Sequence, residues 1–170
     1  MSKDEMQDSD FFDETDDEIQ ENKFLMCKIG NETYGIDIQH VTDIIEMQRI
    51  TEVPDMPEYV RGVINLRGNV IPVIDFRLRF GMECKEFDDR TVITVVNIKD
   101  YSIGFIVDTA TEVVDIPEKN IDPPPSFQED GGKKKYIAGL GKLEDQVIIL
   151  LDMQKLVGQE EIESIQSGVS

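Results

Sequence analysis

The sequence predicts an all-β protein made of two similar five-stranded units with a short C-terminal helix. Two observations lead to this fold class. Apolar runs of four to eight residues, rich in Val and Ile, recur along the chain between Gly, Asn or charged pairs, as expected of short strands joined by tight turns. The same order of runs also occurs twice at a long internal period. Because closure removes exposed strand edges, strands of this length suit two small barrels.

The chain begins with an acidic leader, residues 1–22. It holds ten acidic residues and one base, within a whole-chain balance of 36 acidic and 17 basic residues and a net charge of −19. Such a segment does not bury enough apolar surface to offset its ordering entropy, so we predict that it is disordered. Phe11, Phe12 and Ile19 leave open a short linear motif, although a solubilising leader is the simpler interpretation.

The predicted strands follow the leader in chain order. They are residues 24–29, 33–36, 43–47, 62–67, 69–75, 91–98, 102–107, 112–116, 136–143 and 146–152. Helical periodicity is confined to one or two turns at residues 75–80 and to the segment from residue 152 onward. Three consecutive prolines and a glycine pair mark residues 122–135 as a connection.

An internal repeat relates the two halves of the strand region. Shifts of 69 and 77 positions bring equivalent residues together: Gly35 with Gly104, Thr42 with Thr111, and residues 70–76 with 147–153. The second shift is eight positions longer than the first, and these eight residues fit within the connection at residues 122–135. At one turn the copies differ, because Arg67-Gly68-Asn69 in the first becomes Glu144-Asp145-Gln146 in the second. An arginine beside a glycine on a solvent-facing turn is well placed for recognition.

The repeat suggests a domain organisation. Residues 23–157 form one structured domain of two barrel subdomains with an approximate internal boundary near residues 81–91. Residues 158–170 follow as a C-terminal helix or tail.

The sequence contains no recognisable catalytic or metal site. His40 is the only histidine, which excludes His-rich metal sites and leaves a serine triad without support. Cys27 lies in an apolar run and is predicted to be an inert core thiol, whereas Cys84 lies in a charged turn. Asp75 and Asp152 each end a strand before a helical turn, where a carboxylate caps free N–H groups. We therefore predict no enzymatic activity, no cofactor and no metal.

The charge and hydropathy of the chain restrict its partners. A strong acidic excess argues against nucleic acid or an anionic membrane as the main partner, because both are themselves negative. The N-terminus has no apolar signal region, and no stretch approaches the roughly 18 apolar residues of a membrane span. The sequence therefore predicts a soluble cytoplasmic protein without membrane insertion.

Three blocks of sequence carry a family resemblance. They are YGIDIQHVTDIIE at 34–46, YVRGVINLRGNVIPVIDFRLRFG at 59–81 and YIAGLGKLEDQVIILLDMQKLV at 136–157. These blocks closely resemble the signatures of CheW, the bacterial chemotaxis coupling family, in the family's order and spacing. The resemblance covers about residues 24–157, and its middle block is highly specific.

The resemblance implies a fold and a function. CheW-like proteins consist of two SH3-like five-stranded barrels packed over a shared apolar core, and their strands need not be divided between first and second half. The family has no enzymatic activity. It is an adaptor that joins the histidine kinase CheA to the tips of methyl-accepting chemotaxis receptors, recruited from the cytoplasm to membrane-associated signalling arrays.

The resemblance also implies contact residues. The receptor-binding groove corresponds to Val41, Asp43, Ile44, Gly62, Asn65, Arg67 and Gly68. The family often has Glu at the position of Asp43, paired with the arginine that matches Arg67. Asp is one methylene shorter, so the sequence does not decide whether Asp43 and Arg67 form an ion pair. Kinase contacts correspond to Ile38 and to Phe127, an aromatic residue in a polar, proline-rich loop.

Two other function classes remain possible at this stage. An unrecognised carboxylate site near Asp43 and Arg67 is compatible with an enzyme. An oligosaccharide- or oligonucleotide-binding barrel is the generic alternative, but the absence of Trp, the four Tyr and the acidic balance argue against a stacking platform. Because 170 residues leave no room for a fused receiver domain, we expect a stand-alone adaptor.

Overall fold

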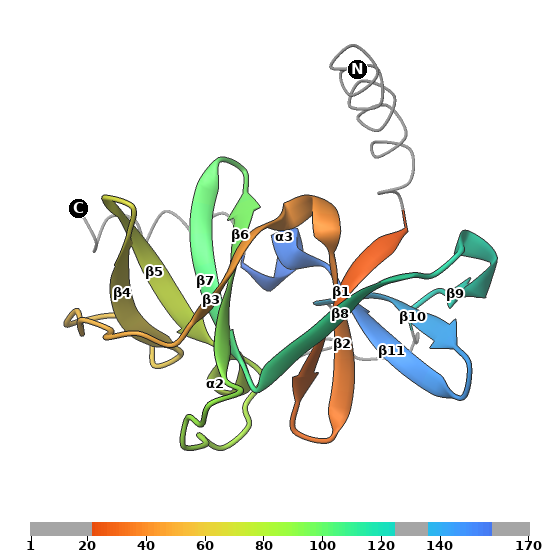
Figure 1. Ribbon diagram of the computed structural model, residues 1–170, viewed down its shortest axis with the longest axis horizontal. Coiled ribbons are helices and arrows are strands. Elements are labelled where there is room, and N and C mark those ends of the chain that lie inside the picture. The colour runs from red at the N-terminus through yellow and green to blue at the C-terminus, as the bar shows by residue number, and fades with distance from the viewer. Residues whose placement is uncertain (1–21, 125–135, 158–170) are drawn as a thin grey trace, which may run out of the picture.

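The computed structural model describes residues 22–124 and 136–157, which form two small β-barrels packed against each other (Figure 1). In chain order the elements are β1 (Lys23–Ile29), β2 (Glu32–Asp37), the 3-10 turn η1 (Ile38–His40), β3 (Val41–Glu46), β4 (Val60–Leu66), β5 (Asn69–Asp75), α2 (Phe76–Arg79), β6 (Val92–Ile98), β7 (Tyr101–Val107), β8 (Thr109–Asp115), η2 (Glu118–Asn120), β9 (Ile121–Asp122), β10 (Ile137–Leu143), β11 (Gln146–Leu151) and α3 (Met153–Leu156). The all-β prediction is confirmed. Strand β9 was not predicted, because two residues carry no periodicity.

The strands form two sheets, and each sheet makes one barrel. Barrel I has the strand order β3-β6-β7-β5-β4, and barrel II has the order β8-β1-β2-β11-β10-β9. One parallel pair occurs in each, β5 with β7 and β2 with β11. Barrel I closes where Thr51, downstream of β3, pairs with Val63 of β4. The N–H of Thr51 donates to the carbonyl of Val63 at 2.9 Å, and the N–H of Val63 donates to the carbonyl of Thr51 at 2.8 Å. Barrel II closes in the same way through β9 and β10.

The internal repeat is visible in the strand register. Gly35 pairs with Met26 and Leu150. Its equivalent Gly104 pairs with Val95 and Val73, which are the equivalents of those two partners. The repeated threonines agree as well, since Thr42 Oγ1 donates to the carbonyl of Val95 at 3.2 Å and Thr111 Oγ1 to that of Met26 at 3.3 Å.

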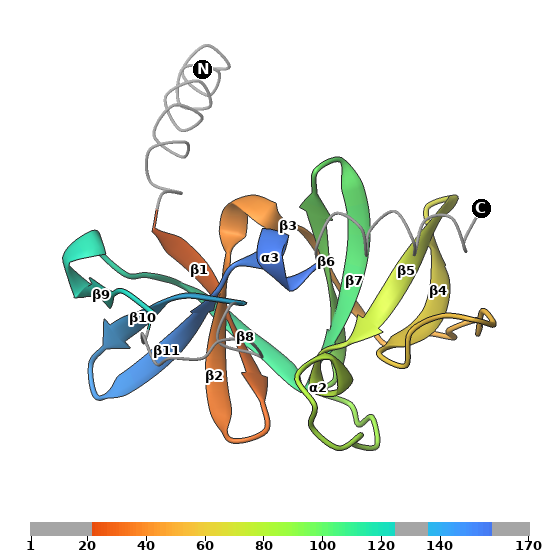
Figure 2. The same cartoon turned by 180° about the vertical axis from the view of Figure 1, so that it is seen from behind.

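The two copies of the repeat exchange strands. Barrel I combines β3, β4 and β5 of the first copy with β6 and β7 of the second, and barrel II combines β1 and β2 with the rest of the second copy. Figure 2 shows the consequence in barrel II, where the red-orange β1 and β2 lie between the teal β8 and the blue β11. The division between subdomains is therefore not near residues 81–91, which connect two elements of barrel I. The chain instead crosses between barrels at η1 and at Asp108.

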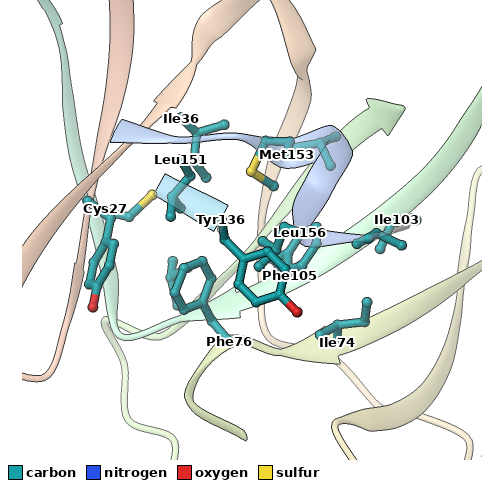
Figure 3. Packing of buried hydrophobic residues seen from close by; sticks show 14 of the residues in the cluster. Cys27, Ile36, Ile74, Phe76, Ile103, Phe105, Tyr136, Leu151, Met153 and Leu156 are labelled. Carbon is teal, nitrogen blue, oxygen red and sulfur yellow. The ribbon is translucent and has the colours of Figure 1, made fainter. Parts of the chain in front are cut away.

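A shared apolar core lies between the barrels (Figure 3). It joins Cys27 and Ile36 of barrel II to Ile74 and Phe105 of barrel I, with Leu156 of α3 inserted between the two sheets. Two smaller clusters fill the barrel interiors. Burial raises the pKa of Cys27 to about 12, so its thiol stays protonated, in agreement with the predicted inert core cysteine.

Each short helix begins at a capping aspartate, as predicted. Asp75 accepts a hydrogen bond from the N–H of Arg77 at 2.9 Å, and Asp152 accepts one from the N–H of Lys155 at 3.1 Å. Helix α3 ends at Leu156, and Val157 after it has an extended backbone. The leader up to residue 21 and the tail from residue 158 onward lie outside the described residues.

Candidate protein-binding site

An ion pair at the surface of barrel I joins Arg67, in the β4–β5 turn, to Asp43 on β3. The guanidinium donates two hydrogen bonds to the carboxylate, Nη2 to Oδ1 at 2.9 Å and Nη1 to Oδ2 at 3.2 Å. Its side chain is 68% exposed and that of Asp43 21% exposed. The shorter side chain of Asp43 therefore reaches Arg67 and forms the ion pair that the sequence alone did not decide. These hydrogen bonds lower the pKa of Asp43 and raise that of Arg67, so both groups are charged at neutral pH.

The turn itself holds Arg67 outward. Arg67 and Gly68 both have positive φ, 54° and 87°, and the N–H of Gly68 donates to Oδ1 of Asn65 at 2.9 Å. Asn65 and Gly68 are exposed. Four of the predicted groove residues, Asp43, Asn65, Arg67 and Gly68, thus come together in one local arrangement.

The remaining predicted groove residues differ in exposure. Ile44 is 47% exposed on β3. Val41 is half-buried and packs against the shared core. Gly62 is buried with φ 145°, and a Cβ at this position would lie 2.1 Å from the carbonyl oxygen of Thr51. Gly62 therefore permits the closure of barrel I and does not line the surface.

The two predicted kinase-contact residues have different outcomes. Ile38 lies in η1, is half-buried and packs against the shared core. Phe127 lies outside the described residues.

An open groove of about 450 Å³ borders the Arg67 turn. Its lining consists of three polar and three aliphatic side chains with one threonine: Gln48, Arg49, Asn65, Val63, Ile64, Val70 and Thr51. Val70, opposite Asn65 in the β4–β5 register, is 52% exposed. Val70, Gln48 and Arg49 were not predicted as groove residues. The sequence shows only that Val70 stands at the start of an apolar strand, whereas Gln48 and Arg49 reach the groove because the chain after β3 closes onto β4.

Barrel II does not repeat this ion pair. Its β10–β11 turn holds Glu144 at the position of Arg67 with the same backbone conformation, φ 55°. Glu112 on β8 stands where barrel I has Asp43. Two carboxylates repel each other, so the paired arginine belongs to barrel I alone.

The sequence that forms these two strand-exchanged barrels matches a known protein family. Residues 23–161 match the family model described as the CheW-like domain. The chain belongs to the CheW-like family. Its match begins at β1, directly after the acidic leader.

Curated relatives and a solved structure are similar to this CheW-like chain. It is 36% identical over 140 residues to chemotaxis protein CheW of Klebsiella aerogenes, which covers 82% of this chain and 84% of the relative. It is 34% identical over 153 residues to chemotaxis protein CheW of Thermotoga maritima, with 90% and 97% covered. The crystal structure of the scaffolding protein TtCheW from Thermoanaerobacter tengcongensis superposes with a TM-score of 0.75 at 34% identity, covering 82% of this chain and 94% of that one.

Two properties of the described residues of this CheW-like chain concern metal binding and membrane insertion. Across residues 22–124 and 136–157, no group of three or more His, Cys, Asp or Glu side chains is placed to hold a metal ion. In the same part of the chain, no helix has the length and apolar character needed to cross a membrane.

Proposed function

We propose that this CheW-like chain is a non-enzymatic adaptor that couples methyl-accepting chemotaxis receptors to the histidine kinase CheA in signalling arrays. It acts in the cytoplasm and is recruited to arrays at the membrane. One observation carries the receptor contact: an exposed arginine, held by Asp43, lies on a turn whose Asn65 lines an open groove, and the equivalent turn of barrel II carries Glu144 instead.

The groove suits an amphipathic receptor helix. Such a helix places its apolar face in a groove and its polar side chains on the rim. Val63 and Val70 supply apolar surface, and Arg67 supplies a directed charge at the edge. A guanidinium has five N–H donors, of which the two bonds to Asp43 use two, so the others remain for an acceptor on the receptor. Because Asp43 already orients the side chain, little rotamer entropy is lost on binding.

The kinase contact is proposed at Ile38 and Phe127. Ile38 lies in η1, one of the two places where the chain crosses between barrels, and it is half-buried against the shared core.

The receptor contact is tested by Arg67→Ala in a binding assay with the purified cytoplasmic tip of a receptor. We expect affinity to fall by about 1–3 kcal/mol, mostly through faster dissociation. Arg67→Lys keeps the charge but loses the two-bond geometry, so its receptor affinity is expected to lie between those of wild type and Arg67→Ala. Glu144→Ala, at the equivalent turn of barrel II, is the matched control and keeps full affinity.

Variants at the proposed kinase contact, compared with Arg67→Ala, separate the two contacts. Arg67→Ala should still bind CheA, whereas Ile38→Asp and Phe127→Ala should bind the receptor tip but fail to assemble receptor and kinase into one complex. Full receptor affinity in the Arg67→Ala protein contradicts the proposed site, and assembly with Phe127→Ala removes Phe127 from the kinase contact.

A further inference from the structure

The open groove beside the Arg67 turn has no acidic residue in its lining, although the chain has 36 acidic and 17 basic residues. Three other openings among the described residues each include a carboxylate, with Asp152 in one, Glu52 in another and Asp108 in the third. The charged residue that lines the groove is Arg49. The groove therefore carries positive charge on a strongly negative chain.

The strand register explains how Arg49 reaches the groove. Thr51 pairs with Val63 in an antiparallel bridge, and continuing this register by two residues places Arg49 opposite Asn65. Asn65 in turn pairs with Val70 of β5. Residues directly opposite one another in a sheet project to the same face, and all three of these residues line the groove. Arg49 and Val70 therefore flank Asn65 from its two sides.

The guanidinium of Arg49 has no bonding partner within residues 22–124 and 136–157, and its side chain is exposed. Arg67, by contrast, is held by Asp43 at 2.9 Å. The acidic residue that follows Arg49 in the closing segment is Glu52, which lines the neighbouring opening together with Arg61. Arg49 therefore keeps its planar set of N–H donors, which matches the geometry of a carboxylate, for an external acceptor.

Barrel II has no arginine at the equivalent place. Its closing pair is formed by Asp122 and Leu140, and the shift of 77 places Leu140 on the β4 residue that closes barrel I. Asn120, two residues before Asp122, therefore takes the place of Arg49. The equivalent turn holds Glu144, as described above. Both arginines thus belong to the barrel that has the acid-free groove.

We propose that Arg49 is a second receptor-contact residue, which selects a receptor helix with a carboxylate facing it across the groove. This inference rests on the proposed receptor contact. A helix whose apolar face lies over Val63 and Val70 directs its flanking side chains to the rim. An Asp or Glu of the receptor gains an ion pair with Arg49 at that rim, whereas a Lys or Arg is repelled, so the pair contributes specificity as well as affinity.

The first test compares two charge reversals in the full-length chain by measuring the affinity for a purified receptor tip. Arg49→Glu should bind about ten-fold more weakly than wild type. Lys119→Glu, at an exposed residue of η2 next to Asn120, makes the same change in net charge and should keep wild-type affinity. Near-ultraviolet circular dichroism checks that both variants are folded. Equal affinities of the two variants overturn the inference.

Arg67→Ala, measured in the same assay, separates this inference from the proposed function. If Arg67→Ala weakens binding and Arg49→Glu does not, the receptor contact stands and the role of Arg49 is wrong. If neither variant weakens binding, both the receptor contact and the role of Arg49 are wrong.

The second test searches for the carboxylate on the receptor. Each Asp and Glu of the receptor tip is changed to Lys in turn, and every variant is measured against wild type and against Arg49→Glu. One receptor variant should lose affinity for wild type and recover most of the ten-fold loss with Arg49→Glu, because the exchanged charges again attract each other. If every receptor variant binds Arg49→Glu no better than the unchanged tip does, Arg49 does not face a carboxylate and the inference is wrong.

Discussion

Gly62 and Gly68 lie six residues apart in the same hairpin, but they have different physical roles. At Gly62 an added Cβ would meet the carbonyl oxygen of Thr51 at 2.1 Å, in a backbone conformation with φ 145°. At Gly68, φ is 87° and no other heavy atom lies within 4 Å of such a Cβ. The first glycine is required by close packing and by conformation, and the second by conformation alone.

This difference predicts two sizes of destabilisation. Gly62→Ala pushes Thr51 away from Val63 and breaks the closure of barrel I, so we expect the free energy of unfolding to fall by about 2–4 kcal/mol. Gly68→Ala has only the left-handed backbone to accommodate and should lose about 1–2 kcal/mol. Urea unfolding of both variants measures the values. Equal losses would show that the contact with Thr51 relaxes without consequence.

At the scale of elements, Asp108 ties the two barrels together where the chain passes from β7 to β8. Its carboxylate accepts hydrogen bonds from Nε and Nη2 of Arg77 in α2, at 2.9 and 2.6 Å. It also accepts one from the N–H of Gly30, in the β1–β2 turn of barrel II, at 2.8 Å. Burial raises the pKa of Asp108, but the bonds from Arg77 and Gly30 and the charge of Arg77 outweigh it, so the pKa is below its ordinary value.

The lowered pKa predicts how this link depends on pH. A carboxyl group with a lower pKa in the folded state stabilises the protein above its unfolded pKa, about 3.9, and loses that contribution as the pH falls through the folded value. We therefore expect Asp108→Asn to be clearly less stable than wild type at pH 7 and the difference to shrink below about pH 4. Unfolding free energies at several pH values measure it.

A second aspartate serves as the control for this experiment. Asp115, whose side chain is 63% exposed, forms an ion pair with Lys23 at 3.0 Å, and ion pairs near the surface contribute little to stability. Asp115→Asn should therefore leave stability nearly unchanged across the same pH range. A constant difference between Asp108→Asn and wild type from pH 7 to pH 3 contradicts a role for the ionised Asp108 carboxylate.

At the scale of the whole molecule, strand exchange makes the two halves of the sequence dependent on each other. A cut within residues 81–91 separates β3, β4 and β5 from β6 and β7 of the same barrel, and β1 and β2 from β8 to β11. Neither fragment then contains a complete barrel, and each holds only part of the shared core.

We therefore expect residues 1–86 and 87–170, produced separately, to lack cooperative unfolding transitions, because each exposes unpaired strand edges and apolar surface. Co-expression should restore a 1:1 complex with the near-ultraviolet circular dichroism of the intact chain. If residues 1–86 fold alone, each repeat is an independent unit and the exchange of strands is not needed for stability.

The sequence by itself determined the properties that are local or periodic. Alternating apolar runs placed ten strands, and aspartates before helical turns marked the caps at Asp75 and Asp152. The equivalence of Gly35 with Gly104 revealed two copies of one unit, and the three blocks indicated the CheW-like family. These features were predictable because each is set by neighbouring residues or by a fixed repeat.

Only the tertiary structure decided which strands share a barrel, because similarity between copies does not say which edges pair. It also decided that Gly62 lies beneath the surface and that Val70 lines the groove beside Arg67. The ion pair of Arg67 with Asp43 needs a turn and a strand 24 residues apart to meet within 3 Å. Such contacts depend on the packing of distant segments, which composition and periodicity do not encode.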